Sequence, residues 1–136
     1  MNRRISIKSK GNCDIIDITT SVAEEVSGSG LRSGTVAVFV SGSTAGVTTI
    51  EYEPGLIDDM QNMWRRLVPE EYPYKHNESW GEDNGYSHIR ASMLGASLVV
   101  PFVDKALSLG TWQQIIVVDF DTRPRSREVV LQIMGE

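Results

Sequence analysis

Both histidines of the chain, His76 and His88, lie in a polar segment from residue 71 to 91 that also holds several carboxylates. An imidazole beside carboxylates can bind a divalent metal or act as a general base near neutral pH. The spacing of the two histidines matches no common zinc motif, so a carboxylate would have to complete a metal site. The alternative is two solvated loop histidines. Because the segment has no helical or strand period, we expect a long functional loop.

The turn SGSTAG, residues 41–46, is a second candidate. Its hydroxyl groups, especially those of Ser43 and Thr44, and its backbone amides could hold an oxyanion such as phosphate. It lacks the lysine and the following helix of a P-loop, and most segments of this composition are simple turns. Side chains that could neutralise a phosphate nearby are Lys75, Arg90 and Arg123.

These residues must be positioned by the elements that the apolar pattern predicts. We expect a hairpin of residues 5–8 and 13–18, a short helix over 20–26, and strands over 34–40 and 47–53. Further elements are a helix over 54–67, a short helix over 87–94, and strands over 97–103, 110–121 and 127–134. The pattern predicts an α+β fold in one domain, residues 1–136. It is mainly an antiparallel β-sandwich with one long amphipathic helix and one or two short ones.

The long helix is scaffold, because its apolar residues fall on one face, with Pro54 in the first turn and Pro69 after the end. Trp112 lies in a polar quartet, residues 110–113, that opens the longest predicted strand. Glycine at such a place indicates a bulge or a close backbone approach. The indole either fills the core or forms the wall of a ligand pocket. Cys13 lies beside apolar strand residues, so we interpret it as a core residue.

The composition limits the class of protein. The chain has 136 residues, with 18 Asp and Glu against 13 Lys and Arg, and a net charge of −5. It has no basic stripe, which argues against a nucleic-acid partner. Its one cysteine excludes an intramolecular disulfide and a multi-cysteine metal site. No apolar stretch approaches the roughly 20 residues that span a bilayer, and the first residues lack a signal-peptide core. We therefore expect a soluble, cytoplasmic protein without a membrane partner.

Three longer stretches carry a resemblance. They read TVAVFVSGSTAGVTTIEYEPG, YKHNESWGEDNGYSHIRASMLGASLVVPF and LGTWQQIIVVDFDTRPRSREVVLQIMGE. Together they resemble the YjbQ family from about residue 3 onward. The resemblance implies a small α+β sandwich that forms homotrimers, with a polar site of loop residues, and thiamine-phosphate synthase activity in some members. The family motif HN corresponds to His76 and Asn77, and its motif WGxxN corresponds to Trp80, Gly81, Asp83 and Asn84. Its later histidine corresponds to His88, and its acid after the TTA-like turn corresponds to Glu51.

One departure from the family pattern concerns the site. Many relatives have HTTAG where this chain has GSTAG, so Gly42 stands at the position of a third family histidine. The resemblance therefore points to a GSTA-type subgroup that lacks one potential metal ligand or acid/base. Lys105 also replaces a usual glycine before the GTWQ motif.

The resemblance implies an enzyme similar to secondary thiamine-phosphate synthase, which joins a pyrimidine diphosphate to a thiazole phosphate and releases pyrophosphate. Departure of pyrophosphate needs cations, amide donors or a divalent metal, Mg²⁺ or Zn²⁺. The catalytic candidates are His76, His88, Asp83 and Glu51, and the candidate metal ligands are Glu51, Glu82, Asp83 and His76. Candidates for binding a small phosphorylated metabolite are Ser43, Thr44, Asn77, Trp80, Asn84, Arg90 and Trp112. Alternatives are a non-catalytic trimeric protein that binds a metal or a phosphorylated metabolite, and a metal-assisted hydrolase.

Overall fold

Strands form most of the computed structural model, which describes residues 1–81 and 83–136, with the backbone alone described at residue 80. The strands are β1 (Asn2–Ser9), β2 (Asp14–Asp17), β3 (Gly34–Ser41), β4 (Ala45–Ile50), β5 (Ser97–Val103), β6 (Ala106–Leu107), β7 (Gln114–Asp119) and β8 (Arg125–Gly135). The helices are α1 (Thr19–Ser27), α2 (Pro54–Leu67), α3 (Lys75–Trp80) and α4 (Gly85–Leu94).

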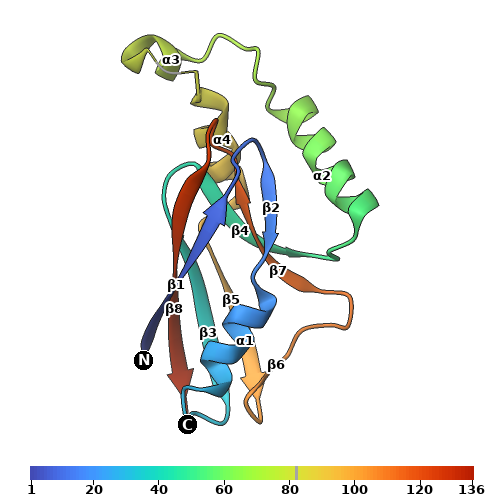
Figure 1. Cartoon of the computed structure of the whole chain (residues 1–136), viewed down its shortest axis with the longest axis vertical. Helices are drawn as coiled ribbons and strands as arrows, with labels where there is room; N and C mark the ends of the chain where they lie inside the picture. The colour runs from blue at the N-terminus through green and yellow to red at the C-terminus, as the bar shows by residue number, and fades with distance from the viewer. Residues whose placement is uncertain (82) are drawn as a thin grey trace.

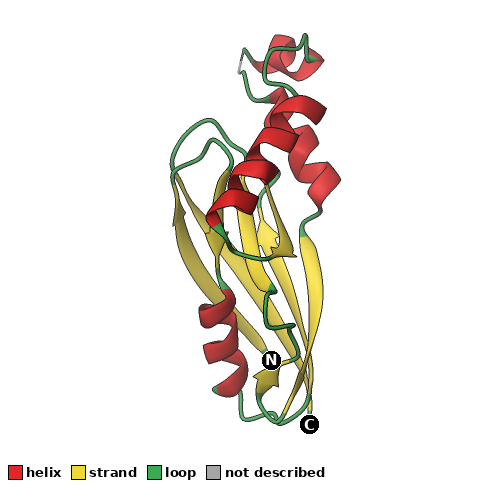
Figure 2. Ribbon diagram, turned by 90° about the vertical axis from the view of Figure 1, so that its right-hand side faces the viewer, coloured by secondary structure: helices red, strands yellow, loops and turns green. Residues whose placement is uncertain are grey.

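Two sheets form the body of the protein (Figure 1). One has five strands in the order β1-β8-β3-β5-β6, and the other has three in the order β2-β7-β4. Every strand pairing that the structure describes is antiparallel. The predicted α+β fold with mainly antiparallel strands is confirmed. Helices α2, α3 and α4 gather toward one end, while α1 and both chain termini lie toward the other (Figures 1 and 2).

Strand β7 is buried on both faces, which explains its continuous apolar sequence. Ile115 and Val117 face a core cluster shared with the five-stranded sheet and α1. Ile116, Val118 and Phe120 face a second cluster, formed with α2 and α4. The molecule therefore has three layers, two sheets and a helical layer, and β7 lies in the middle one.

Helix α2 has the bounds that the sequence predicts, Pro54–Leu67. The Glu53 carboxylate accepts hydrogen bonds from the amides of Gly55 and Leu56 and so caps the first turn. Trp64 packs edge-on against Phe120, with 5.1 Å between ring centroids, and fastens the helix to β7. In the part of the chain that the structure describes, no helix has both the length and the hydrophobicity needed to cross a membrane.

The predicted hairpin of the first two strands is wrong, because β1 pairs with β8 and β2 pairs with β7, in different sheets. The connecting residues Gly11, Asn12 and Cys13 all have positive φ, at 76°, 54° and 63°. Such a run turns the chain sharply, and it carries the chain from one sheet to the other. Cys13 is buried, as predicted, and burial raises its pKa to about 11.

The polar segment is not one long loop, since it contains α3 and the start of α4. Gly81, at φ 67°, ends α3, and the side chain of Asn77 accepts a hydrogen bond from the Gly85 amide at 2.9 Å, which starts α4 earlier than predicted. These contacts are tertiary, so a periodicity argument misses them. The strand predicted from residue 110 begins only at Gln114, because residues 110–113 form a turn. The short β6 was not predicted, and β4 ends at Ile50 rather than residue 53.

Candidate functional site

A cluster of buried charges lies at the end of the sandwich where α4 meets the β3–β4 and β7–β8 turns, opposite the chain termini (Figure 1). Successive side chains in a strand alternate between its faces. Asp119 and Asp121 therefore continue the inner face of β7, and Arg125 and Arg127 begin the inner face of β8. Two short ion pairs, Arg127–Asp119 and Arg125–Asp121, and a longer one between Arg127 and Asp121 join the strands at this point, where the apolar core ends.

The deeper pair is bidentate. Arg127 Nε lies 2.8 Å from Asp119 Oδ2, and Arg127 Nη2 lies 2.9 Å from Oδ1. The two side chains are 6% and 0% exposed, so neither charge has bulk water as an alternative partner. Arg127 Nη2 also donates to the hydroxyl of Thr44 at 2.6 Å, and Thr44 donates to Asp121 at 3.0 Å. Thr44, predicted as a hydroxyl donor, is thus built into this charge network.

Burial by itself would raise the pKa of Asp121, but its partners outweigh burial, and the pKa is lowered from its ordinary value of 3.8. These partners are the Thr122 amide at 2.8 Å, the Thr44 hydroxyl, and the Arg125 guanidinium with Nε at 2.6 Å. The carboxyl group is therefore held ionised at neutral pH. An ionised Asp121 keeps Thr44 and Arg125 in place.

The lowered pKa of Asp121 predicts a contribution to acid stability. Because the folded pKa lies below the unfolded value, Asp121 stabilises the fold above about pH 4 and loses this effect as the pH falls through the folded pKa. Asp121→Asn should therefore unfold more easily at pH 7 and lose less further stability on acidification than the wild type. Urea titrations over a pH series measure both slopes. If acidification lowered the free energy of unfolding of the two proteins equally, the result would contradict the prediction.

The two histidines converge beside this cluster. His76 comes from α3 and His88 from α4, and their ring centroids lie 4.4 Å apart with 59° between the planes. The Nε2 atom of His76 is buried and has no hydrogen-bond partner among the described residues. A buried ring nitrogen without a partner can receive or give a proton to a ligand without first breaking a protein contact. The histidine pair that the sequence singles out is thus assembled by the fold.

A hollow of about 250 Å³ adjoins His88. Residues from the β3–β4 turn and from α4 and its C-terminal end line it: Gly42, Ser43, Ala45, His88, Ala91, Ser92, Gly95 and Ala96. Ser43 is exposed here, so its hydroxyl can reach a ligand. The sequence predictions for His88 and for the hydroxyl turn therefore meet in one cavity.

Gly42 is required by its surroundings. Its φ of 148° lies in a region that side-chain-bearing residues rarely adopt, and a Cβ there would lie 2.6 Å from Arg127 Nη1. The guanidinium of Arg127 thus occupies the space into which a histidine side chain would begin to extend. In this chain a cation therefore stands beside the position where the resemblance places a third family histidine.

Two predicted ligand-binding residues have structural roles instead. Asn77 uses its side-chain oxygen to cap α4, as described above. Arg90 is 2% exposed and donates through Nε and Nη2 to the carbonyl of Val68, at 3.0 and 2.8 Å. Its guanidinium also lies over the Tyr86 ring, 4.7 Å from the centroid. Arg90 therefore ties α4 to the end of α2.

Glu51 and Trp112 lie together, but not with the histidines. They line a hollow of about 440 Å³ with Asp17, Tyr52, Glu53, Pro54, Thr111 and Gln114. Trp112 is 73% exposed and lines this hollow, so of the two alternatives for its indole the core position is excluded. The three carboxylates in this lining would repel an anion, which speaks against phosphate binding by Trp112.

The structure describes three of the four side chains that were expected to hold a metal, and Glu82 is the exception. Glu51 lies in the hollow with Trp112, and Glu82 and the side chain of Trp80 lie outside the described residues. Asp83 is exposed and lines a further hollow beside Asn84. Within residues 1–81 and 83–136, no group of three or more His, Cys, Asp and Glu side chains could hold a metal ion. Of the expected ligands, Glu51 and Asp83 therefore line different hollows.

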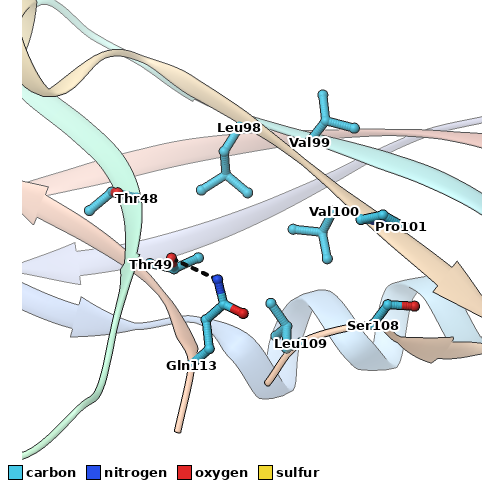
Figure 3. Close-up of a pocket in the computed structure, with 9 residues that line it drawn as sticks. All are labelled: Thr48, Thr49, Leu98, Val99, Val100, Pro101, Ser108, Leu109 and Gln113. Carbon is cyan, nitrogen blue, oxygen red and sulfur yellow. Dashed lines mark hydrogen bonds between the residues drawn. The ribbon is translucent and has the colours of Figure 1, made fainter. Parts of the chain in front are cut away.

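Another hollow, of about 240 Å³, lies between β4 and β5, away from the charge cluster (Figure 3). Its nine lining residues include no charged side chain, and Gln113 Nε2 donates to Thr49 Oγ1 at 3.1 Å within it. None of the residues predicted for chemistry is among the nine. We therefore assign the candidate site to the charged end.

Sequence reasoning missed Asp119, Asp121, Arg125 and Arg127 as site residues. A signal was present, because the alternating series Ile115, Val117, Asp119, Asp121 and Arg125, Arg127, Val129, Leu131 each place two charges on an otherwise apolar face. Opposite charges at the facing ends of two strands predict a buried ion-pair cluster if the strands lie close together. That condition is supplied only by the fold.

The fold and the site define a class: small α+β sandwich proteins with a histidine pair and a buried charge cluster at one end. The family model described as UPF0047 protein YjbQ-like matches residues 3–136, and the chain belongs to this family.

Individual relatives span the whole chain. A UPF0047 protein of Methanothermobacter thermautotrophicus is 33% identical over 134 residues, covering 98% of this chain and 92% of that protein. UPF0047 protein YugU of Bacillus subtilis is 34% identical, covering 99% and 100%. The crystal structure of a hypothetical protein from Aeropyrum pernix K1 superposes with a TM-score of 0.93 at 34% identity, covering 100% of this chain and 99% of that one. An uncharacterized conserved protein of the family from Clostridium acetobutylicum superposes at 0.88 with 33% identity, covering 97% and 99%.

Proposed function

We propose that this protein is a transferase resembling thiamine-phosphate synthase, which joins a pyrimidine diphosphate to a thiazole phosphate. In this reaction the bond between carbon and the diphosphate oxygen breaks, and pyrophosphate leaves with the electron pair. The ring nitrogen of the thiazole then supplies the electron pair for the new bond to that carbon. The site must therefore stabilise negative charge on the leaving group and exclude competing water.

The observation that carries the proposal is that His88, paired with His76, lines a hollow with Gly42, which lies against the buried guanidinium of Arg127. Arg127 is already charged and oriented by Asp119, so it need not reorganise when charge develops on a phosphate. The unpartnered Nε2 of His76 and the ring of His88 are suited to move a proton to a phosphate oxygen. The Ser43 hydroxyl and the amides of the same turn would donate to that oxygen.

A divalent cation belongs to the proposal as an ion carried by the substrate phosphates. Mg²⁺ is commonly held by one or two carboxylates together with substrate phosphates and water. The chemistry that such an ion would supply is neutralisation of phosphate charge.

The test is direct. Purified protein incubated with both substrates and Mg²⁺ should form thiamine phosphate, detected by mass spectrometry, and His88→Ala should lower the rate by at least about 100-fold. Met93→Ala is the matched control, because Met93 lies 58% exposed on the same helix. No product above a blank from wild-type protein whose circular dichroism shows it folded would reject the transferase proposal.

One observation favours a second candidate, a non-catalytic protein that binds a phosphorylated metabolite. Asp119, Asp121, Arg125 and Arg127 largely satisfy one another, as in a structural ion-pair network. This candidate predicts that a phosphorylated compound binds without being consumed. Calorimetric binding with no turnover of either thiamine precursor or of generic phosphatase substrates would support it over the transferase and over a metal-assisted hydrolase.

We further propose that the protein forms a homotrimer through the outer face of the five-stranded sheet. Phe39, Val99, Val103 and Met134 are 45%, 63%, 57% and 61% exposed on the three neighbouring strands β3, β5 and β8. Exposed apolar surface on this scale is typical of an interface. Sedimentation velocity at micromolar concentration tests it, and a monomer would contradict it. A cytoplasmic location and the absence of a nucleic-acid partner remain predictions from composition.

A further inference from the structure

A hollow of about 400 Å³ lies between the N-terminal end of α4 and the β7–β8 turn. It shares no lining residue with the hollow beside His88. Six residues line it: Asp83, Asn84, Asp121, Thr122, Arg123 and Arg125. The cavity thus offers polar and charged groups only, and it is separate from the histidine cavity.

Asn84 is the most informative of these residues. It is 6% exposed, its Nδ2 donates weakly to Asp121 at 3.4 Å, and its Oδ1 has no hydrogen-bond partner among the described residues. Although Asn84 stands at the N-cap of α4, its side chain does not cap the helix, and the Ser87 amide donates instead to its backbone carbonyl at 3.0 Å. A buried acceptor without a donor costs free energy. Oδ1 is therefore ready to accept from a ligand N–H or O–H.

The opposite wall is cationic. Arg125 Nε lies 2.6 Å from Asp121 Oδ2 as an ion pair, but it is not aligned as a hydrogen bond, so this N–H also has no hydrogen-bond acceptor in the described structure. The Arg125 side chain is 35% exposed, whereas that of Asp121 is 2% exposed. Arg123 is exposed beside it. Since Asp121 is already matched by Arg125 and Thr44, the charge of Arg123 is available to an anion.

The β7–β8 turn, which lines the hollow, is held in place by the connection between β1 and β2. The Asn12 amide donates to the carbonyl of Asp121 at 2.6 Å, so the β1–β2 connection supports the β7–β8 turn from below. Gly11, at φ 76°, lies so close that a Cβ would be 2.5 Å from the Arg123 carbonyl oxygen. A wall held in this way keeps its geometry before a ligand arrives, which lowers the entropy cost of binding.

We propose that this hollow binds a small zwitterionic or hydroxylated anion, with its phosphate or carboxylate at Arg123 and Arg125 and a donor at Asn84 Oδ1. The exposed carboxylate of Asp83 favours an ammonium donor at that end. The geometry of the hollow alone supports binding of such an anion. Binding of one of the two phosphorylated substrates there rests on the proposed transferase function.

The experiment compares phosphoethanolamine with ethyl phosphate by isothermal titration calorimetry. Both probes carry a phosphate monoester, and only the first has an ammonium donor. We expect the wild-type protein to bind phosphoethanolamine about tenfold more tightly. Arg123→Ala should weaken both probes by about tenfold. Asn84→Ala should remove the difference between them. Arg66→Ala, which deletes an exposed arginine of α2, is the control for lost charge.

Equal affinity of the wild type for the two probes would overturn the proposal, as would an Arg123→Ala variant that binds like Arg66→Ala. The comparison of probes uses the unaltered protein, so it stands even where Asn84→Ala fails to fold. The outcome is also separable from the transferase test. Selective binding without formation of thiamine phosphate rejects the reaction alone, and product formation without selective binding rejects this hollow alone.

Discussion

Arg127→Met is expected to lower the free energy of unfolding by about 3–5 kcal/mol, because it leaves a buried carboxylate without its partner. Asp119 is fully buried and receives two hydrogen bonds from the Arg127 guanidinium. Methionine fills much of the same space but returns neither the charge nor the hydrogen bonds. Thr44 would also lose the donor that holds its hydroxyl. Urea denaturation at pH 7 measures the loss.

The control is Arg4→Met on the neighbouring strand pair. Arg4 and Glu128 also form an ion pair at 3.0 Å, but their side chains are 63% and 45% exposed. An exposed pair of this kind contributes less than about 1 kcal/mol. Adding Asp119→Leu to Arg127→Met should recover much of the stability, since removing both charges leaves nothing unpaired. If Arg127→Met and Arg4→Met lost equal stability, the buried network would not have the role assigned to it.

Gly42→His should destabilise the protein by roughly 2–4 kcal/mol instead of restoring a family-like third histidine. Two costs add. The backbone at φ 148° strains a residue with a side chain, and the new Cβ meets Arg127 Nη1 at 2.6 Å. Arg127 cannot move aside cheaply, because Asp119 holds it through two hydrogen bonds. Thermal and urea unfolding of the variant measure the cost.

Ser43→His is the matched control, since Ser43 is the next residue of the same turn, is exposed, and has no positive φ. It should be tolerated within about 0.5 kcal/mol. If Gly42→His were as stable as Ser43→His, the Arg127 side chain would have moved away from the new Cβ at little cost in free energy. Position 42 would then tolerate the histidine of typical relatives, and Arg127 would not be the group that takes its place.

Gly42 illustrates how far local sequence reasoning reaches. The prediction at Gly42 rests on the resemblance to the family pattern HTTAG, against GSTAG in this chain. It could not show what fills the space. Arg127 lies 85 residues away along the chain, and only the pairing of β3 with β8 brings the two together.

The same limit explains the errors in the fold. The apolar series of α2 predicted its bounds, because the apolar residues of a helix with one buried face repeat with the helical period. The hairpin of β1 and β2 was a reasonable inference from Gly11 and Asn12, but a turn signal does not tell which sheet each strand joins. Residues 71–91 showed no period because α3 and α4 are short and are held by tertiary contacts such as the Asn77 cap.

The sequence by itself predicted the class of fold, the bounds of the long helix, and a strand at β7, although from residue 110 rather than 114. It also singled out His76 and His88 as candidates for chemistry. Each of these depends on residue type and local spacing. Only the tertiary structure decided that the histidines meet at 4.4 Å, that Glu51 and Trp112 lie elsewhere, and that Arg90 is structural. It also decided that Asp119, Asp121, Arg125 and Arg127 form an ion-pair cluster at the end of the sandwich that holds the candidate site. The physical reason is that burial and charge pairing depend on contacts between strands distant in sequence.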